Sequence, residues 1–355
     1  MSRQSLGVRI QKMHGEKTLI LANKLELSDK RLEIKRVGDF VYIPLVRQPS
    51  EPELKQLDRA TEARVSTYVF QEKTRRSTTL AELLDGKLAP HLIASLPRSA
   101  DIIGTIAVVE ISPELEAYKT IVGEAMLSLN KNVRTVLAKT GPVSGTYRLR
   151  KLSVIAGENN TVTVHKEYGC RYYVDLSKAY FSPRLSHEHH RVASLVHEGE
   201  TVIDMFAGVG PFAILIARMV KNVKVYAVDA NPHAIEFLRK NIRLNRVENK
   251  VIPIMGDAKE VVNERLYGKA DRVIMNLPES ARDFICASCD GLTQAGGTVH
   301  FYGFMKASES LEGMQAGFDD AVKQCGRKVA KILSSRFVRA TAPYEWQFVL
   351  DVQVA

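Results

Sequence analysis

A short turn that contains two glycines is the clearest candidate for chemistry in this sequence. The apolar run from Thr201 ends in Asp204, and Gly208 and Gly210 follow before a second apolar segment begins at Pro211. Glycine permits positive φ angles and lets the backbone approach a ligand closely. A strand, a tight turn and a helix in this order direct the free N–H groups of the helix N-terminus toward a bound group. The turn therefore predicts a cofactor site.

Acidic residues also follow the next two apolar runs. Asp229 comes directly after Val223–Val228, where an acidic side chain accepts the hydroxyl groups of a ribose. Asp257 follows Val251–Met255, in position to hold the amino group of an adenine. These positions predict a cofactor that contains adenosine.

Two features favour S-adenosylmethionine over a dinucleotide. Asp204 stands just before the glycine turn, where its carboxylate suits the amino group of a methionine rather than a pyrophosphate. Asn276 and Pro278 follow the fourth apolar run, where class I methyltransferases that modify ring or exocyclic nitrogens often carry a similar turn. The asparagine carbonyl can orient a planar base, and the proline forms a rigid wall. The sequence thus predicts methylation of a base by S-adenosylmethionine.

The elements that must position these residues occupy about residues 170–355. Strands and helices alternate there, which indicates a doubly wound, mostly parallel sheet. The expected strands are Thr201–Phe206, Val223–Val228, Val251–Met255, Arg272–Met275 and Thr298–Phe304, and the expected helices are Pro211–Val220, Pro232–Asn245 and Leu311–Cys325. Two terminal β-like runs, Lys328–Val338 and Gln347–Val354, predict an antiparallel strand inserted at the sheet edge. We expect an α/β, Rossmann-like class I methyltransferase fold.

Two small α+β domains are expected before it, at 1–70 and 93–169, with a linker over 71–92. The first has a predicted helix at Gln11–Leu25 and a hairpin that turns at Gly38 and Asp39. The second has a buried strand at Ile102–Ile111 and a helix at Leu115–Leu129. Its other expected strands are Val133–Ala138 and a pair, Leu152–Ala156 and Thr161–His165, that turns at 157–160.

Composition narrows the class of partner and the compartment. The net charge of +10 favours a polyanionic partner such as nucleic acid. The four cysteines, Cys170, Cys286, Cys289 and Cys325, are too few and too scattered for a disulfide framework, so we expect a reducing compartment. Cys286 and Cys289 form a single pair, which predicts a structural role and no zinc site. We see no signal peptide and no membrane span, and expect a cytoplasmic protein.

Three further segments carry a resemblance to a known family. Tyr180–His189 reads YFSPRLSHEH, Leu96–Gly104 reads LPRSADIIG, and Asp29–Asp39 reads DKRLEIKRVGD. Together with the glycine turn and the Asn276–Pro278 turn, they resemble the archaeal and eukaryotic tRNA (guanine-N1)-methyltransferases that act at tRNA position 37. The resemblance covers nearly the whole chain, and its most specific part is the segment that begins at Tyr180.

The resemblance implies roles for individual residues. It makes Glu188 the general base, Arg148 the essential arginine, and Asn276 and Pro278 the turn that holds the target base, with Tyr180 and Arg184 in the same segment as the base. Combined with the glycine turn and the acidic residues, it gives these expected cofactor contacts: His189, Asp204, Phe206, Gly208, Gly210, Asp229, Ala230, Asp257, Ala258 and Asn276.

Methylation of guanine explains why these residue types are needed. Guanine N1 carries a proton at neutral pH, and a carboxylate such as Glu188 can remove it as a general base. General-base catalysis typically raises the reaction rate by about 10²–10⁴-fold. Negative charge then develops on O6, which Arg148 can stabilise. The guanine must leave its stack to enter such a pocket, which costs less in a single-stranded loop.

Other functions stay open on sequence alone. A wyosine-pathway precursor at the same tRNA position, or aminocarboxypropyl transfer from the same cofactor, is the alternative within enzymes, and a non-catalytic tRNA-binding protein is the alternative of another class. We expect a monomer without a metal that meets the anticodon loop and the elbow of tRNA. Basic residues such as Lys35, Arg36, Arg75 and Arg76 are candidates for phosphate contacts.

Overall fold

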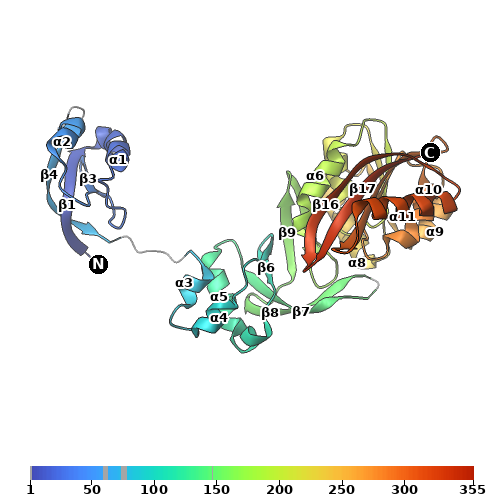
Figure 1. Ribbon diagram of the computed structural model, residues 1–355, viewed down its shortest axis with the longest axis horizontal. Coiled ribbons are helices and arrows are strands. Elements are labelled where there is room, and N and C mark those ends of the chain that lie inside the picture. Colours follow the sequence, from blue (N-terminus) through green and yellow to red (C-terminus); the bar gives the residue numbers. More distant parts are fainter. Residues whose placement is uncertain (1, 59–62, 73–77, 146) are drawn as a thin grey trace. The chain divides into compact units, whose positions relative to one another are not determined.

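The chain divides into two compact units, Met1–Ser77 and Thr78–Ala355. The computed structural model describes residues 2–58, 63–72, 78–145 and 147–355 (Figure 1). The candidate phosphate contacts Arg75 and Arg76 lie outside the described residues.

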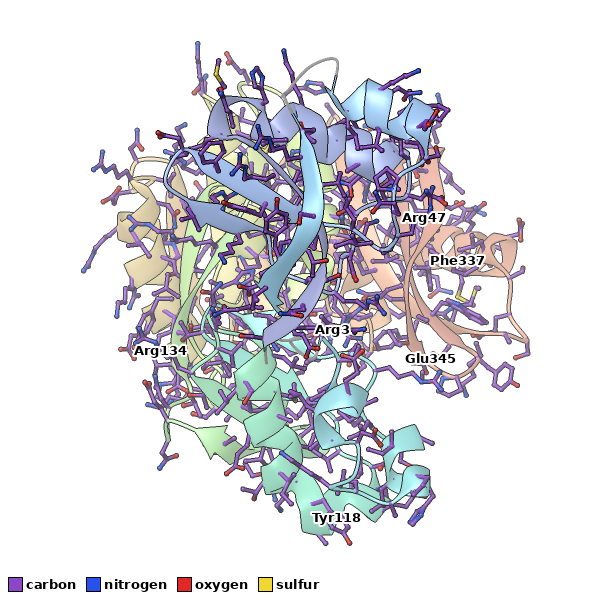
Figure 2. The ribbon with its side chains drawn as sticks, turned by 90° about the vertical axis from the view of Figure 1, so that its left-hand side faces the viewer. Arg3, Arg47, Tyr118, Arg134, Phe337 and Glu345 are labelled. Atoms are coloured by element: carbon purple, nitrogen blue, oxygen red, sulfur yellow. A yellow bond between two sulfur atoms is a disulfide. The ribbon has the colours of Figure 1, made fainter. Side chains whose placement is uncertain are left out.

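The first unit is a four-stranded sheet in the order β2-β3-β1-β4 with two helices. Its elements are β1 (Ser2–Gln11), α1 (Gly15–Lys24), β2 (Lys35–Val37), β3 (Phe40–Pro44), α2 (Glu51–Asp58) and β4 (Arg64–Gln71). The hairpin at Gly38, which has a φ of 56°, is as predicted. Strand β1 was not predicted, although its buried residues Val8 and Ile10 alternate with more exposed ones as a strand requires. Arg3 and Arg47, labelled in Figure 2, belong to this unit.

The second unit begins with helices packed on a four-stranded sheet in the order β5-β6-β7-β8. Its elements are α3 (Leu80–Leu84), α4 (Pro90–Ala94), β5 (Asp101–Ile103), β6 (Ile106–Val109), a 3-10 turn (Pro113–Tyr118), α5 (Lys119–Leu129), β7 (Thr135–Ser144) and β8 (Leu149–Gly157). Tyr118, labelled in Figure 2, ends the 3-10 turn. Leu84 and Leu88 are buried in the core of this sheet, so residues 78–92 are not the expected linker.

Two strand predictions in this region are wrong. The run Ile102–Ile111 is a hairpin rather than one strand, because the chain reverses at Gly104, which has a φ of 56°. The run Thr161–His165 does not pair with the preceding strand. It belongs to β9 (Val162–Glu167), which pairs with β10 (Cys170–Asp175), whereas β8 pairs with β7.

The rest of the chain confirms the Rossmann-like prediction. Seven strands lie in the order β13-β12-β11-β14-β15-β17-β16. They are β11 (Thr201–Asp204), β12 (Lys224–Asp229), β13 (Val251–Met255), β14 (Arg272–Met275), β15 (Gly297–Lys306), β16 (Val329–Ala342) and β17 (Glu345–Val354). Strands β11 to β15 pair in parallel, and β17 is inserted antiparallel between β15 and β16. Phe337 and Glu345, labelled in Figure 2, lie on these last two strands.

Helices cover both faces of this sheet (Figure 1). One core includes buried residues of α6 (Ser186–Ser194), α7 (Pro211–Met219) and α8 (Pro232–Asn245), together with β10. The other core includes residues of α9 (Ala258–Val261), α10 (Ile285–Gly291) and α11 (Leu311–Gln324). In the part of the chain that the structure describes, no helix combines the length and the apolar character needed to cross a membrane.

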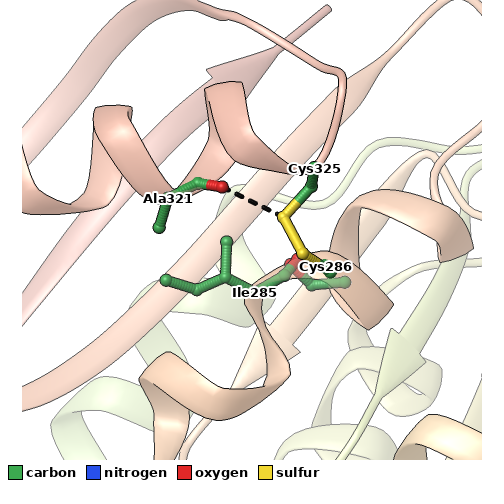
Figure 3. The surroundings of a disulfide bond; sticks show 5 residues. Ile285, Cys286, Ala321 and Cys325 are labelled. Atoms are coloured by element: carbon green, nitrogen blue, oxygen red, sulfur yellow. Dashed lines mark hydrogen bonds between the residues drawn. A yellow bond between two sulfur atoms is a disulfide. The ribbon is translucent and has the colours of Figure 1, made fainter.

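A disulfide joins Cys286 on α10 to Cys325 just after α11 (Figure 3). The sequence did not predict this bond, because the two cysteines are 39 positions apart and meet only when both helices pack on the same face, which brings their Cα atoms to 5.1 Å. Cys170 and Cys289 are free and buried.

Two asparagines of α8 complete the hydrogen bonding of β10. Asn241 accepts a hydrogen bond from the backbone N–H of Tyr173 at 2.6 Å and donates to the carbonyl oxygens of Tyr173 and Val209, each at 3.0 Å. Asn245 bonds the backbone N–H and C=O of Arg171 in the same way. Because Val209 lies between the two glycines, Asn241 also fixes the glycine turn.

Asn241→Ala is expected to lower the free energy of unfolding by about 3 kcal/mol, because it leaves buried backbone groups without partners. Urea denaturation followed by circular dichroism measures this change. The exposed Asn249 provides the matched control, and Asn249→Ala is expected to change the free energy by less than about 0.5 kcal/mol. Equal stabilities of the two variants would contradict the role given to Asn241.

Candidate active site

A cavity of about 200 Å³ opens where the carboxyl ends of β11, β12, β13 and β14 meet. In doubly wound sheets this edge is where ligands bind. Most of the predicted site residues line it: Arg148, Tyr180, His189, Phe206, Gly208, Asp229, Ala230, Asp257, Ala258, Asn276 and Pro278. Three predicted site residues, Glu188, Asp204 and Gly210, are not part of its lining.

The two glycines of the turn serve different purposes. Gly208 has a φ of 54° and lines the cavity, and a Cβ at this position would have only the carbonyl oxygen of Tyr180 nearby, at 3.8 Å. Gly210 has a φ of 95° and caps α7, and a Cβ there would lie 2.4 Å from Leu238. Gly208 thus leaves room for a ligand, whereas Gly210 is required by helix packing.

Asp204 lies at the end of β11 behind the cavity wall. Its side chain is fully buried, and neither carboxylate oxygen has a hydrogen-bond partner of normal geometry among the described residues. Burial raises the pKa of Asp204 to about 7; the backbone N–H groups of Phe206 and Ala213 oppose this rise, and the charge of Asp229 adds to it. An unpaired buried carboxyl group is a strong site for a cationic ligand group.

Asp229 and Asp257 occupy the ends of the next two strands. Asp229 accepts hydrogen bonds from the N–H groups of Gly208 at 2.7 Å and Asn231 at 2.8 Å, while burial raises its pKa. Asp257 caps α9 by accepting from the N–H of Lys259 at 2.8 Å. Each carboxylate keeps lone pairs for a ligand.

Asn276 is oriented by residues that the sequence did not predict. Its side-chain oxygen accepts from Gln347 at 3.3 Å, and Gln347 accepts from the Nε of Arg339 at 3.0 Å. Arg339 also donates to Ser182 at 3.2 Å. Gln347 and Arg339 line the cavity from β17 and β16, and no motif in those strands indicates this role.

Arg148 lies on the other side of the cavity, in the connection between β7 and β8. It has a φ of 52°, a conformation that costs energy for a residue with a side chain. Its guanidinium pairs with Glu279 at 3.0 Å and lies 5.7 Å from the centre of the Tyr180 ring. Its buried Nε has no partner among the described residues, which leaves a donor for a ligand.

Glu188 is buried in a network of charged groups. Its Oε2 accepts from the Nε of Arg191 at 3.1 Å and from the hydroxyl of Tyr302 at 3.0 Å, and its Oε1 pairs with Arg336. Arg191 in turn pairs with Asp351 at 2.5 Å. In this structure the carboxylate of Glu188 therefore faces arginines rather than the cavity.

The neighbouring His189 does face the cavity. Its Nδ1 forms a 2.6 Å hydrogen bond with Glu167, and its ring packs edge-to-face on Phe212, with the centroids 4.6 Å apart. His190 instead stacks on Tyr168. Among the described residues no three His, Cys, Asp or Glu side chains form a group that could hold a metal ion.

Three sequence models of known families match the chain in succession. Residues 7–53 match the tRNA methyltransferase 5 N-terminal domain, residues 80–161 match the TYW2 N-terminal domain, and residues 163–330 match the TRM5/TYW2 methyltransferase domain. The order of the matches follows the order of the folded parts described above.

Relatives match over the full length. A protein of Pyrococcus abyssi named tRNA (guanine(37)-N(1))-methyltransferase Trm5b is 38% identical over 99% of each chain. A protein of the same name from Methanocaldococcus jannaschii is 36% identical over 98% of each chain. A solved structure described as the complex of aTrm5 and tRNALeu is 34% identical, with a TM-score of 0.78 over 99% of this chain and 100% of that chain. The chain therefore belongs to the Trm5 family of tRNA (guanine(37)-N(1))-methyltransferases.

Proposed function

We propose that this protein methylates N1 of guanosine at tRNA position 37, using S-adenosylmethionine. The observation that carries the proposal is one cavity that joins a cofactor half, around Gly208 and Asp229, to a base half, around Asn276, Pro278 and Tyr180. The full-length relatives named for this reaction support it.

The residues of the cofactor half fit S-adenosylmethionine, which when bound supplies an electrophilic methyl group. The carboxyl of Asp204, which is buried and has no hydrogen-bond partner of normal geometry among the described residues, matches the ammonium group of the methionine portion. We assign Asp229 to the ribose hydroxyls, and Asp257 and Ala258 to the adenine, because all three line the cavity. The open space beside Gly208 leaves room for the ligand between them.

Glu188 is the residue we assign to remove the N1 proton. It lies one position before His189, which lines the cavity, and its carboxylate has three hydrogen-bond donors around it. A carboxylate has about four acceptor positions, so one remains for a proton. Arg336 is the most exposed of these partners, with a side chain 38% accessible, and is the one that a substrate would displace.

Arg148 is the residue we assign to O6 of the guanine. Its Nε has no partner among the described residues, and its position beside Tyr180 provides a donor where negative charge develops. Asn276 and Pro278 form the opposite wall, and the hydrogen bond from Gln347 holds the Asn276 amide in one orientation. Correct orientation of the base is itself a large part of such catalysis.

We further propose that tRNA binds through its anticodon loop at this cavity and through its elbow at the first unit. The net charge of +10 favours such a polyanion. We place the enzyme in the cytoplasm and expect it to act as a monomer.

The test is transfer of labelled methyl groups to tRNA transcripts that carry guanosine or adenosine at position 37. We expect 1-methylguanosine, identified by mass spectrometry, from the first transcript alone. Cofactor binding without transfer to either transcript would indicate a wyosine-type substrate or a non-catalytic protein. Transfer of label from the methionine chain instead of the methyl group would indicate the aminocarboxypropyl reaction.

The raised pKa of Asp204 predicts that cofactor affinity depends on pH. A cation favours the ionised carboxyl, so binding releases a proton below pH 7, and affinity rises with pH up to about 7 and then levels off. Calorimetry with S-adenosylhomocysteine should give an affinity about tenfold weaker at pH 6 than at pH 8. Asp204→Asn should remove this dependence, and an unchanged dependence would contradict the assignment.

A substitution that preserves the size of Glu188 distinguishes its role as a base from its role in packing. Glu188→Gln keeps the size of the side chain but cannot take a proton, so single-turnover methyl transfer should slow by about 100-fold or more. Affinity for S-adenosylhomocysteine should not change. The exposed Glu198 is the control, and Glu198→Gln should retain the wild-type rate. A wild-type rate for Glu188→Gln would exclude Glu188 as the base.

The pair formed by Arg148 and Glu279 allows a similar test. Arg148→Lys keeps the charge but not the guanidinium donors, and should slow methyl transfer by about 10²–10³-fold. Glu279→Gln leaves the guanidinium in place without its ion-pair partner and should transfer at nearly the wild-type rate. An equal loss of methyl-transfer rate in the two variants would show that the ion pair with Glu279, rather than the guanidinium donor, determines the rate.

A further inference from the structure

We infer that Asp351 is a positioning residue for the proposed base, because it binds both terminal nitrogens of Arg191 and leaves Glu188 a single N–H from that arginine. The inference rests on the assignment of Glu188 as the base and adds a residue from a part of the described structure that does not line the cavity. Asp351 lies on β17 and is 2% exposed. Without it, the guanidinium would present two N–H groups to Glu188 and neutralise more of the charge that must accept the proton.

The three nitrogens of Arg191 have separate acceptors. Its Nε donates to Oε2 of Glu188 at 3.1 Å, whereas Nη1 and Nη2 donate to the two carboxylate oxygens of Asp351 at 2.5 and 3.2 Å. A guanidinium binds a carboxylate most strongly through two such bonds. Arg191 forms this double contact with Asp351 and a single bond with Glu188. Its positive charge is therefore directed more toward Asp351 than toward Glu188.

Asp351 is itself held by His300, which lies opposite it on the neighbouring strand β15. The Nδ1 of His300 is 2.5 Å from Oδ1 of Asp351, and the Nε2 is 2.8 Å from Nη1 of Arg272. An arginine nitrogen can only donate, so Nε2 accepts and Nδ1 carries the proton that His300 donates to Asp351. Burial also lowers the pKa of His300. A neutral His300 thus fixes the Asp351 carboxylate without removing its charge.

Arg272 anchors this series of hydrogen bonds in the sheet. Its Nε and Nη2 donate to the two carboxylate oxygens of Glu200 at 2.7 and 2.9 Å, and Nη2 also donates to the carbonyl oxygen of Leu195 at 2.8 Å. Arg272, His300 and Asp351 lie on β14, β15 and β17, which are neighbours in the sheet. The position of the Arg191 guanidinium is therefore set by the sheet and not by α6 alone.

The other groups around Glu188 show why the charge of Arg191 matters. Tyr302 of β15 donates its hydroxyl to Glu188 at 3.0 Å, and burial raises the pKa of Tyr302, so it stays a neutral donor. Arg336 of β16 is the partner that we assign to leave when a substrate binds. The histidines on either side of Glu188 in the chain contact other residues. Once Arg336 has left, Arg191 is the cation that limits how readily Glu188 accepts a proton.

The test is the rate of single-turnover methyl transfer in Asp351→Asn, with S-adenosylmethionine and tRNA at saturation. The asparagine keeps an oxygen that accepts from His300 but presents an NH₂ group to Arg191, which cannot bond it. The guanidinium then turns toward Glu188 and makes it a weaker base, so transfer should slow by about tenfold. Affinity for S-adenosylhomocysteine, measured by calorimetry, should not change.

Two double variants separate this role from a purely structural one. Asp351→Asn added to Glu188→Gln should slow transfer no further, because Asp351 acts through Glu188. Arg191→Gln added to Asp351→Asn removes both charges of the pair and should recover most of the lost rate. Removal of the whole pair also leaves no unpaired buried charge, so this variant should fold even if Asp351→Asn alone does not.

The exposed Asp85 provides a matched control, and Asp85→Asn should transfer methyl groups at the wild-type rate. A wild-type rate in Asp351→Asn, further slowing of Glu188→Gln by Asp351→Asn, or a slow Arg191→Gln/Asp351→Asn variant would each overturn the inference. The proposed base is decided separately by Glu188→Gln alone. If that variant is slow while Asp351→Asn is not, the base assignment stands and only the role of Asp351 is lost.

Discussion

The constraint on which this site depends is a fully buried carboxyl group that has no hydrogen-bond partner of normal geometry among the described residues. Asp204 ends the central strand of the parallel part of the sheet, directly beneath the glycine turn. Burial of the ionised form of such a group costs free energy, and this cost raises the pKa of Asp204 to about 7. The surrounding strands hold Asp204 in place, so a bound cationic ligand group would lower this free-energy cost. We propose that this carboxyl, directly behind the cavity wall, sets the end of the cavity at which the cofactor's ammonium group binds.

Glu188 differs from Asp204 in having hydrogen-bond and ion-pair partners. Two arginines and a tyrosine hydroxyl contact its carboxylate. Arg191 in turn forms an ion pair with Asp351. Burial alone would raise the pKa of Asp351, but hydrogen bonds from His300 and Arg191 lower it to about 2. Such a network holds the Glu188 carboxylate in one position before a substrate arrives. Arg336 on the edge strand β16 is the partner most open to exchange.

Sequence reasoning succeeded where a residue's position in the fold follows from the local order of strands and helices. The alternation of strands and helices predicted the sheet, and the chain position of Gly208 and Asp229 placed both at its ligand edge. It failed where the partner is distant. Nothing near Asn276 indicates that Gln347 orients it, and nothing near His189 indicates Glu167, because these pairs form only when separate strands and helices pack together. The hairpin at Gly104 was missed because its two strands are both apolar, which leaves no break in the pattern.

The most direct measurement is a crystal structure of the protein with S-adenosylhomocysteine and a tRNA that carries guanosine at position 37. The account predicts that the guanine lies against Asn276 and Pro278, with the carboxylate of Glu188 released from Arg336 and about 2.6–3.2 Å from N1. A complex in which Glu188 remains paired with Arg336 and no carboxylate approaches N1 would contradict the central claim that this buried acid takes the proton.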